Sequence, residues 1–435
     1  MNVLIVGSGG REHSLAWALS RSPSKPGIFG LPGNPGIAEL GENLPTDMLD
    51  PSTVLQAVRE TRIDLVVVGP EAPLVDGLAD ALNQAGVRVF GPSAAAAEIE
   101  GSKVFAKDLM ERYGIPTAGH QVAYDADAAN RIAAGVGYPH VLKADGLAAG
   151  KGALIVQSRA EAEEAIDAMM VKKQFGDAGA RVVFEEFLEG EEMSVFAVAS
   201  GERYVLLTTS QDYKRAHDGD RGLNTGGMGA YAPVVTWNDT LAEHVCTEII
   251  EPTLLAMARE DRPYTGLLYA GLMVREKKAR VVEFNCRFGD PETQALVPII
   301  DGDLLELLWE ASDPAIGKRP LPECAHDGRT AVCVVLSSGG YPGKVTTGHT
   351  IHGIEKAREV SGALVFHAGT GMDKSNLVTR GGRVLNVVGV DRTLPAAQEC
   401  AYVAASKIEF EGVFCRRDIG WRGLEALSAR SNSES

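Results

Sequence analysis

Short apolar runs alternate with helix-period patterns over the first hundred residues. The pattern predicts strands at 2–6, 63–68 and 87–90 and helices at 11–21 and 74–85. Strands that alternate with helices imply a mostly parallel, doubly wound sheet, whose ligand crevice lies beyond the carboxyl ends of the strands. The glycine-containing segments 7–10 and 69–71 fall at two of these ends.

A second pattern begins after Ser102, which we expect to cap a helix that ends at Gly114-Ile115-Pro116. Residues 120–190 then predict a small, self-contained α+β unit. Its expected elements are helices at 125–135 and 159–170 and strands at 139–143, 153–157 and 181–186.

The rest of the chain predicts long strands and few helices. We expect a helix at 239–260, a hairpin through 275–278 and a further helix near 395–407. Proline and glycine cluster at 313–328, which indicates a linker, and the tail 428–435 is expected to be disordered. These changes predict domains at residues 1–102, 103–327 and 328–435.

Composition agrees with about three globular domains in 435 residues. The 58 acidic and 42 basic side chains give a net charge of −16, so we expect no nucleic acid and no anionic membrane as partner. No apolar run approaches the roughly 20 residues of a membrane helix, and the N-terminus is typical of a strand rather than a signal peptide. We therefore expect a cytoplasmic protein with six reduced cysteines, since no CxxC pair occurs.

The first glycine loop, at 7–13, joins a strand to a helix, where free amides and the helix dipole suit a phosphate. It is not a dinucleotide fingerprint, because Glu12 stands where the third glycine is required. A tight turn without a ligand stays open as an alternative. Glu71 follows a neighbouring strand and is placed to accept from a sugar hydroxyl, although a solvated loop acid is the alternative.

The second glycine loop, at 143–152, is not a P-loop. Gly146 and Gly150 have three residues between them instead of four, and Gly152 follows Lys151. We expect a hairpin flap in which Lys143 and Lys151 neutralise nucleotide phosphates. The alternative is a solvated surface hairpin, but Lys143 ends an apolar strand, where a lysine is seldom buried without an anionic partner.

Side-chain alternation along the strand 281–287 places Glu283, Asn285 and Arg287 on one face. A carboxylate and an amide oxygen at this spacing suit magnesium, and the arginine suits a transferring phosphoryl group. A polar sheet face with an ion pair is the alternative. Asp290 and Glu292 follow in a tight turn beside the expected metal.

Two further segments have binding chemistry. The loop 210–215 leads to the glycine run 224–229, which offers amides to an anion or lets a substrate lie against the backbone. Residues 185–188 lie between two expected strands and are typical of a hinge that binds an adenine edge through backbone groups.

Six motifs occur in order: GSGGREH at 7–13, GPEAPL at 69–74, KADGLAAGKG at 143–152, NTGGMG at 224–229, RFGDPETQ at 287–294 and CRRDIGWR at 415–422. Over residues 1–422 the chain resembles the glycinamide ribonucleotide synthetases, the phosphoribosylamine-glycine ligases of the ATP-grasp superfamily. The resemblance implies an α/β and α+β multidomain fold: a doubly wound N-terminal substrate-binding domain, an ATP-grasp core with a mobile lid at about 120–190, and a small C-terminal α+β domain.

The implied activity is ATP-dependent ligation of glycine to 5-phosphoribosylamine through a glycyl phosphate, in de novo purine biosynthesis. ATP is the implied cosubstrate and Mg²⁺ or Mn²⁺ the implied cofactor. The expected partners are small molecules, and we expect a monomer.

The resemblance also implies roles for individual residues. ATP would bind Lys103, Lys143, Asp145, Gly146, Gly150, Lys151, Gly152, Glu185, Glu186, Phe187, Leu188 and Glu192. The other substrates would meet Gly9, Gly10, Arg11, Glu12, Glu71, Asp212, Asn224, Thr225, Gly226, Gly227, Asp290 and Glu292. Arg287 and Lys214 would act at the reacting centre, and Glu283 and Asn285 would hold the metal.

Two positions depart from the family pattern. Leu223 stands where proline is common before NTGG, and the strand 266–274 has no acid, so the extra metal ligand of many ATP-grasp relatives is missing there. The alternatives are another ATP-grasp carboxylate-amine ligase, a nucleotide-binding oxidoreductase that uses the first glycine loop, and a nucleotide sensor without activity.

Overall fold

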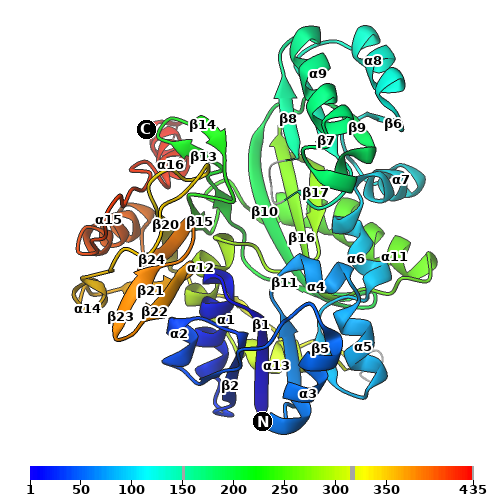
Figure 1. Ribbon diagram of the computed structural model, residues 1–435. Coiled ribbons are helices and arrows are strands. Elements are labelled where there is room, and N and C mark those ends of the chain that lie inside the picture. Colours follow the sequence, from blue (N-terminus) through cyan, green and yellow to red (C-terminus); the bar gives the residue numbers. More distant parts are fainter. Residues whose placement is uncertain (149–151, 314–318, 434–435) are drawn as a thin grey trace.

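The N-terminal part of the chain forms a parallel sheet covered by helices on its faces. The computed structural model describes residues 1–148, 152–313 and 319–433 (Figure 1). The sheet order is β3 (Glu42–Asn43), β2 (Gly27–Pro32), β1 (Asn2–Gly7), β4 (Leu65–Val68) and β5 (Arg88–Phe90), with every pairing parallel. The doubly wound prediction is confirmed. From β1 the chain adds strands first on one side of the sheet and then, from β4, on the other side. The crevice lies at the carboxyl ends of β1 and β4, where this order reverses.

Short helices connect these strands. They are α1 (Gly10–Ser20), α2 (Pro35–Ala38), α3 (Pro51–Thr61), α4 (Glu71–Val75), α5 (Leu78–Gln84) and α6 (Ala94–Gly101). The single helix predicted at 74–85 is wrong, because Gly77 adopts a φ of +86° and divides it into α4 and α5.

The predicted α+β unit at 120–190 is an antiparallel four-stranded sheet with helices on one face. Its strand order is β6 (His120–Ala123), β9 (Val182–Glu186), β7 (His140–Ala144) and β8 (Ala153–Val156). The helices are α8 (Ala126–Gly135) and α9 (Arg159–Ile166). The helix α9 continues into the π-helix η1 (Asp167–Val171), and a short 3-10 helix, η2 (Gly176–Ala180), follows. The preceding helix α7 (Lys103–Tyr113) is capped as predicted, since Ser102 Oγ accepts from Phe105 N at 3.1 Å.

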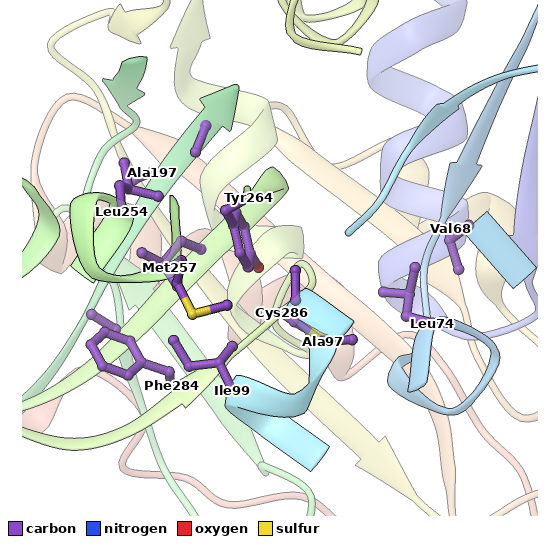
Figure 2. Close-up of a cluster of buried hydrophobic side chains, with 14 of the residues drawn as sticks. Val68, Leu74, Ala97, Ile99, Ala197, Leu254, Met257, Tyr264, Phe284 and Cys286 are labelled. Carbon is purple, nitrogen blue, oxygen red and sulfur yellow. The ribbon is translucent and has the colours of Figure 1, made fainter. Parts of the chain in front are cut away.

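A second antiparallel sheet lies beneath this unit. It contains β11 (Arg203–Leu206), β10 (Glu191–Ser200), β16 (Thr265–Arg275) and β17 (Lys278–Asn285), and β16 and β17 form the predicted hairpin. The predicted helix at 239–260 is confirmed as α10 (Asp239–Val245), η3 (Cys246–Ile250) and α11 (Glu251–Arg259). Figure 2 shows the core that joins this sheet and α11 to the N-terminal part, with Val68, Leu74, Ala97, Ile99, Ala197, Leu254, Met257, Tyr264, Phe284 and Cys286 labelled. One continuous apolar cluster therefore holds the two parts together.

A third antiparallel sheet contains strands from both sides of the expected linker. Its order is β12 (Gln211–Asp212), β15 (Gly229–Ala232), β20 (Thr330–Ser337), β24 (Arg383–Asp391) and β21 (Ala363–His367). The C-terminal segment thus pairs directly with residues 211–232, through β15 and β20.

Smaller elements complete the chain. The ribbons are β13 (Arg215–His217) with β14 (Arg221–Asn224), β18 (Ile300–Asp301) with β19 (Ala325–His326), and β22 (Thr370–Asp373) with β23 (Asn376–Thr379). The remaining helices are α12 (Glu292–Leu296), η4 (Val297–Ile299), α13 (Leu304–Ala311), α14 (Ile354–Arg358), α15 (Leu394–Ala405) and α16 (Trp421–Ser433).

The prediction of a disordered tail is wrong for residues 428–433, which belong to α16. In the described parts of the chain, no helix has the length and apolar character needed to cross a membrane. All six cysteines are free thiols, as predicted.

Candidate active site

The four large sheets surround a cavity of about 780 Å³. Its walls come from the carboxyl ends of β1 and β4, the strands β7, β8 and β17, the 212–226 segment, and Arg383 and Arg422 near the C-terminus. Most of the predicted site residues line it: Gly9, Arg11, Glu12, Glu71, Lys103, Lys143, Gly152, Glu185, Glu186, Phe187, Leu188, Glu192, Asp212, Lys214, Asn224, Thr225, Gly226, Glu283, Asn285, Arg287, Asp290 and Glu292.

Four predicted residues do not line the cavity. Asp145 instead caps α7, since its Oδ1 accepts from Val104 N at 2.7 Å, and it pairs with Arg181. Gly146, Gly10 and Gly227 lie behind the wall, where a Cβ would meet neighbouring atoms at 2.8, 2.1 and 2.4 Å respectively. Gly150 and Lys151 are outside the described residues.

One end of the cavity gathers buried lysines around a single carboxylate. Lys143 Nζ lies 3.0 Å from both oxygens of Glu185, and Lys107 Nζ lies 2.9 Å from its Oε2. All three side chains are almost fully buried. Burial lowers the pKa of Lys107 to about 8, although Glu185 acts in the opposite direction, and burial also lowers the pKa of Lys103. The Lys107–Glu185–Lys143 cluster has two ammonium groups and one carboxylate, which suits an anionic ligand.

Apolar side chains lie beside these lysines. Val141, Ile155, Phe187, Leu188 and Met273 line the same part of the cavity. Ile155 and Phe187 are among the exposed large apolar side chains of the protein. A flat, largely apolar ring next to a polyanion therefore fits this end.

Glu283 and Asn285 come from β17 and line the cavity between the two ends. Burial alone would raise the pKa of Glu283, but Lys214, Lys143 and Lys103 together hold it below its usual value. No hydrogen bond or ion pair of the described residues reaches the Glu283 carboxylate. The pair is chemically suited to a hard cation, but within the described residues no three His, Cys, Asp or Glu side chains form a complete metal site.

The guanidinium of Arg287 is held between two carboxylates from the N-terminal part. Its Nε lies 3.3 Å from Glu71 Oε2, and its NH2 lies 3.1 Å from Glu100 Oε1. Burial alone would lower the pKa of Arg287, but Glu100 and Glu71 raise it. The ion pair that the strand pattern left open therefore forms with these acids and not with Glu283.

Two amides of the first glycine loop are already used within the protein. Gly9 N donates to Glu12 Oε2 at 2.6 Å, and Arg11 N donates to Asp290 Oδ2 at 3.0 Å. The expectation of free amides at these two positions is wrong, because the Glu12 carboxylate caps α1 at Gly9 N and the Asp290 carboxylate accepts from Arg11 N. The capping role of Glu12 also explains why an acid stands at the position where a dinucleotide-binding loop needs glycine.

Asp290 joins three distant segments at the other end of the cavity. Besides Arg11, it contacts Arg383, whose NH1 lies 2.8 Å from Asp290 O and 3.1 Å from its Oδ1. The same NH1 donates to Gly226 O at 2.5 Å. Burial alone would raise the pKa of Asp290, but Arg383 and Arg11 lower it.

Lys214 pairs with Glu192 and lies 3.8 Å from Asp212 Oδ1. Burial opposes its charge, but Asp212 and Glu192 raise the pKa of Lys214 well above its ordinary value. Burial raises the pKa of Asp212 to about 7, against the effect of Lys214.

Glu292 lies close to this group with one oxygen unused. Its Oε1 accepts from Tyr269 OH at 2.8 Å, while its buried Oε2 has no hydrogen-bond donor among the described residues. A buried carboxylate oxygen without a donor suits a ligand amine or ammonium.

Sequence reasoning missed Glu100, Lys107, Tyr269 and Arg383. Lys107 has a local signal, because it follows Lys103 by four residues on α7 and so shares its face. The other three have no local signal, since their partners are distant in the chain.

The fold, with nucleotide-suited lysines between two antiparallel sheets, defines an ATP-grasp enzyme. Family models of phosphoribosylglycinamide synthetase match the chain as N domain at 1–100, ATP-grasp (A) domain at 101–293 and C domain at 331–422. The chain belongs to the phosphoribosylglycinamide synthetase family.

Relatives from bacteria match over nearly their whole length. The chain is 45% identical to phosphoribosylamine–glycine ligase of Escherichia coli K12 over 429 residues, which cover 98% of this chain and 99% of that one. It is 47% identical to the Agrobacterium fabrum C58 ligase over 424 residues, with 98% and 99% coverage.

Solved structures with similar folds agree with this family assignment. The crystal structure of phosphoribosylamine–glycine ligase from Thermotoga maritima matches with a TM-score of 0.84 and 36% identity, and covers 96% of this chain and 100% of that one. A biotin carboxylase domain from Hydrogenobacter thermophilus, solved with MgADP, has a TM-score of 0.69 at 15% identity over 95% and 91% of the chains. At that identity the likeness shows the fold alone.

Proposed function

We propose that this chain ligates glycine to 5-phosphoribosylamine, giving glycinamide ribonucleotide, ADP and phosphate, in de novo purine biosynthesis. The family and the two chemically different ends of one cavity support this activity. The reaction follows from the poor electrophilicity of a carboxylate. A glycine carboxylate oxygen attacks the γ-phosphorus of ATP, the bridging bond to ADP breaks, and the product is glycyl phosphate. The amine of phosphoribosylamine then attacks the acyl carbon, phosphate leaves, and the amine loses a proton.

ATP binds at the lysine-rich end in this proposal. Lys103, Lys143 and Gly152 face the phosphates, and the apolar side chains beside residues 185–188 hold the adenine ring. The excess of ammonium groups over carboxylates at Lys107, Lys143 and Glu185 supports this assignment. Binding of a polyanion supplies the missing negative charge.

Glu283 and Asn285 are the proposed ligands of Mg²⁺ or Mn²⁺. The donor types fit a hard cation that keeps water and nucleotide oxygens in its other positions. The free and ionised Glu283 carboxylate supports the assignment. When bound, the cation neutralises charge on the phosphates. Arg287, held in one orientation by Glu71 and Glu100, faces the transferring group.

The acid and amine substrates occupy the other end of the cavity. The unused Glu292 Oε2 receives an amine or ammonium, and Lys214 faces a carboxylate or acyl phosphate. Gly9, Arg11, Glu12, Glu71, Asp290 and the 224–227 loop surround phosphoribosylamine. The domain boundaries 102/103 and 327/328, a monomer and a cytoplasmic location remain part of the proposal.

The observation that carries the proposal is the continuity of the cavity from the Lys107–Glu185–Lys143 cluster to Glu292 and Asp290. The test measures ADP release with ATP and glycine, with ATP and phosphoribosylamine, and with all three. We expect full turnover only with all three, and far lower turnover when serine or alanine replaces glycine. Equal turnover with serine or alanine indicates an ATP-grasp ligase for another acid. Turnover without the amine contradicts the ligation.

A further inference from the structure

The turn 218–220 of the β13–β14 ribbon is bound to the segment 416–418, which precedes α16. Figure 1 shows the ribbon beside α16. Three hydrogen bonds of 2.8 Å join them: Gly219 N to Asp418 Oδ2, Arg417 N to Asp218 Oδ1, and Arg416 NH1 to Asp220 Oδ1. Arg422 also pairs with Asp220. We call these residues, 218–220 with 416–418 and Arg422, the hairpin clamp.

Arg416 is the centre of the hairpin clamp. It is 1% exposed. Its Nε and NH2 donate to the two oxygens of Asp418 at 2.7 Å each, which is a bidentate pair. Its NH1 also donates to Arg215 O at 3.2 Å, and its guanidinium lies over the Tyr213 ring at 5.0 Å. The fork and the stacking require arginine rather than lysine.

Arg416 lies directly behind a wall of the cavity. Tyr213 and Arg215, which it contacts, flank Lys214 in the chain. Backbone hydrogen bonds continue into the glycine run, from Thr225 N to Lys214 O at 2.7 Å and from Met228 N to Tyr213 O at 2.7 Å. A shift of the 212–215 segment therefore moves both Lys214 and the 224–229 loop.

We propose that Arg416 is a positioning residue that, through Tyr213 and Asp220, holds Lys214 and the 224–229 loop against the acid and amine substrates. This inference rests on the proposed function. Arg416 does not reach the cavity itself, whereas Asp220 and Arg422 line it. Among the described residues, no hydrogen bond or ion pair joins the hairpin clamp to Lys107, Lys143 or Glu185. Arg416 therefore acts on the carboxylate and amine substrates and leaves ATP binding unchanged.

The test compares Arg416→Met, Arg416→Lys and Asp220→Asn with Arg329→Met. Arg329 pairs with Asp327 outside the cavity and serves as the matched control. For each protein we measure the KM for glycine and phosphoribosylamine, the equilibrium Kd for ATP, and the ratio of product to ADP. Hydrogen exchange of residues 212–229 reports on the local order of the segment.

We expect Arg416→Met to raise at least one of the two substrate KM values about tenfold or more and to lower the product-to-ADP ratio. The Kd for ATP stays within about twofold of the wild-type value, and hydrogen exchange at 212–229 becomes faster. The substrate KM values and exchange rates of Arg416→Lys lie between those of Arg416→Met and those of the wild type. We expect Asp220→Asn to keep the Arg416–Asp418 pair and the fold. This variant therefore tests the hairpin clamp even where Arg416→Met does not fold.

Two results overturn the inference. One is unchanged substrate KM and unchanged exchange in Asp220→Asn and Arg416→Lys. The other is an equal loss of ATP affinity and substrate affinity, which indicates general destabilisation. If ADP release by the wild-type protein does not need glycine and the amine, the proposed function is contradicted instead. Hydrogen exchange at 212–229 still measures separately whether the hairpin clamp orders this segment.

Discussion

The ammonium of Lys107 lies 2.9 Å from Oε2 of Glu185, and both side chains are only 3–4% exposed. Glu185 is also the partner of Lys143, so one buried carboxylate serves two buried ammonium groups. The cluster therefore keeps a net positive charge when no nucleotide is bound. Such a charge is costly unless an anion arrives.

Glu185→Gln leaves two buried ammonium groups without a counter-charge. We expect the free energy of unfolding to fall by about 3–5 kcal/mol. Lys107→Met leaves a neutral Lys143–Glu185 pair, so we expect a change of less than about 1 kcal/mol. Urea unfolding without nucleotide at pH 7 measures both. Equal destabilisation by the two substitutions would falsify the charge arrangement.

Glu283→Gln removes a carboxylate that has neither a hydrogen bond nor an ion pair with the described residues. We expect stability to change by less than about 1 kcal/mol, because no hydrogen bond or ion pair between described residues is lost and burial opposes the favourable effect of the nearby lysines. The rate of ADP formation falls by about a hundredfold or more, and higher magnesium or added manganese restores part of it. The control is Glu276→Gln, an exposed acid in the turn of the same β16–β17 hairpin. A lower melting temperature with ordinary metal dependence contradicts the metal assignment.

Gly10→Ala tests the packing behind the first glycine loop. A Cβ at Gly10 meets Asn386 Nδ2 at 2.1 Å and Gln294 Nε2 at 2.5 Å. We expect a loss of about 1–3 kcal/mol in stability and a higher KM for phosphoribosylamine, with ATP Kd unchanged. Gly135→Ala is the control, because a Cβ there has nothing within 4 Å. It leaves stability unchanged or raises it by up to about 1 kcal/mol.

Acid destabilises the contact between α1 and β21 through two buried histidines. His367 N donates to His13 Nδ1 at 2.8 Å. Burial lowers the pKa of His367 from 6.5 to about 4, with Arg358 adding to the shift, and burial also lowers the pKa of His13. Below pH 6.5 the unfolded chain binds more protons than the folded chain, so stability falls as pH decreases towards 4.

For His367 alone, the loss of unfolding free energy at pH 5 is on the order of 2 kcal/mol. We expect His367→Leu to flatten the slope of stability between pH 7 and pH 5, although stability at pH 8 falls slightly because Thr370 loses its partner. His352→Leu, at an exposed site, keeps the wild-type slope. Urea unfolding at pH 8, 7, 6 and 5 checks this, and an unchanged slope in His367→Leu removes His367 as a cause.

Local patterns were sufficient where a local cause decides the structure. Period-two alternation put Glu283, Asn285 and Arg287 on one face, and all three line the cavity. Capping chemistry located the start of α7 at Ser102. Family resemblance added the nucleotide and substrate roles, which stay predictions.

Local patterns failed where partners are distant in the chain. Nothing near Arg287 shows that Glu100 neutralises it, and nothing near Asp290 points to Arg383. Asp145 belongs to a segment whose composition is typical of a phosphate-binding loop. Its carboxylate instead caps α7, because it accepts a hydrogen bond from Val104 N. The tail looked polar enough for disorder, but Trp421 and Leu424 pack on the core and support α16.

The hairpin clamp joins residues that are 196 positions apart, from Asp220 to Arg416. During synthesis from the N-terminus, every lysine of the nucleotide end leaves the ribosome long before segment 416–418 is made. A chain whose synthesis stops before residue 416 carries a nucleotide end without a supported Lys214. On the proposed roles, such a fragment binds ATP but binds the acid and amine substrates weakly, so full catalytic competence waits until segment 416–418 has been made.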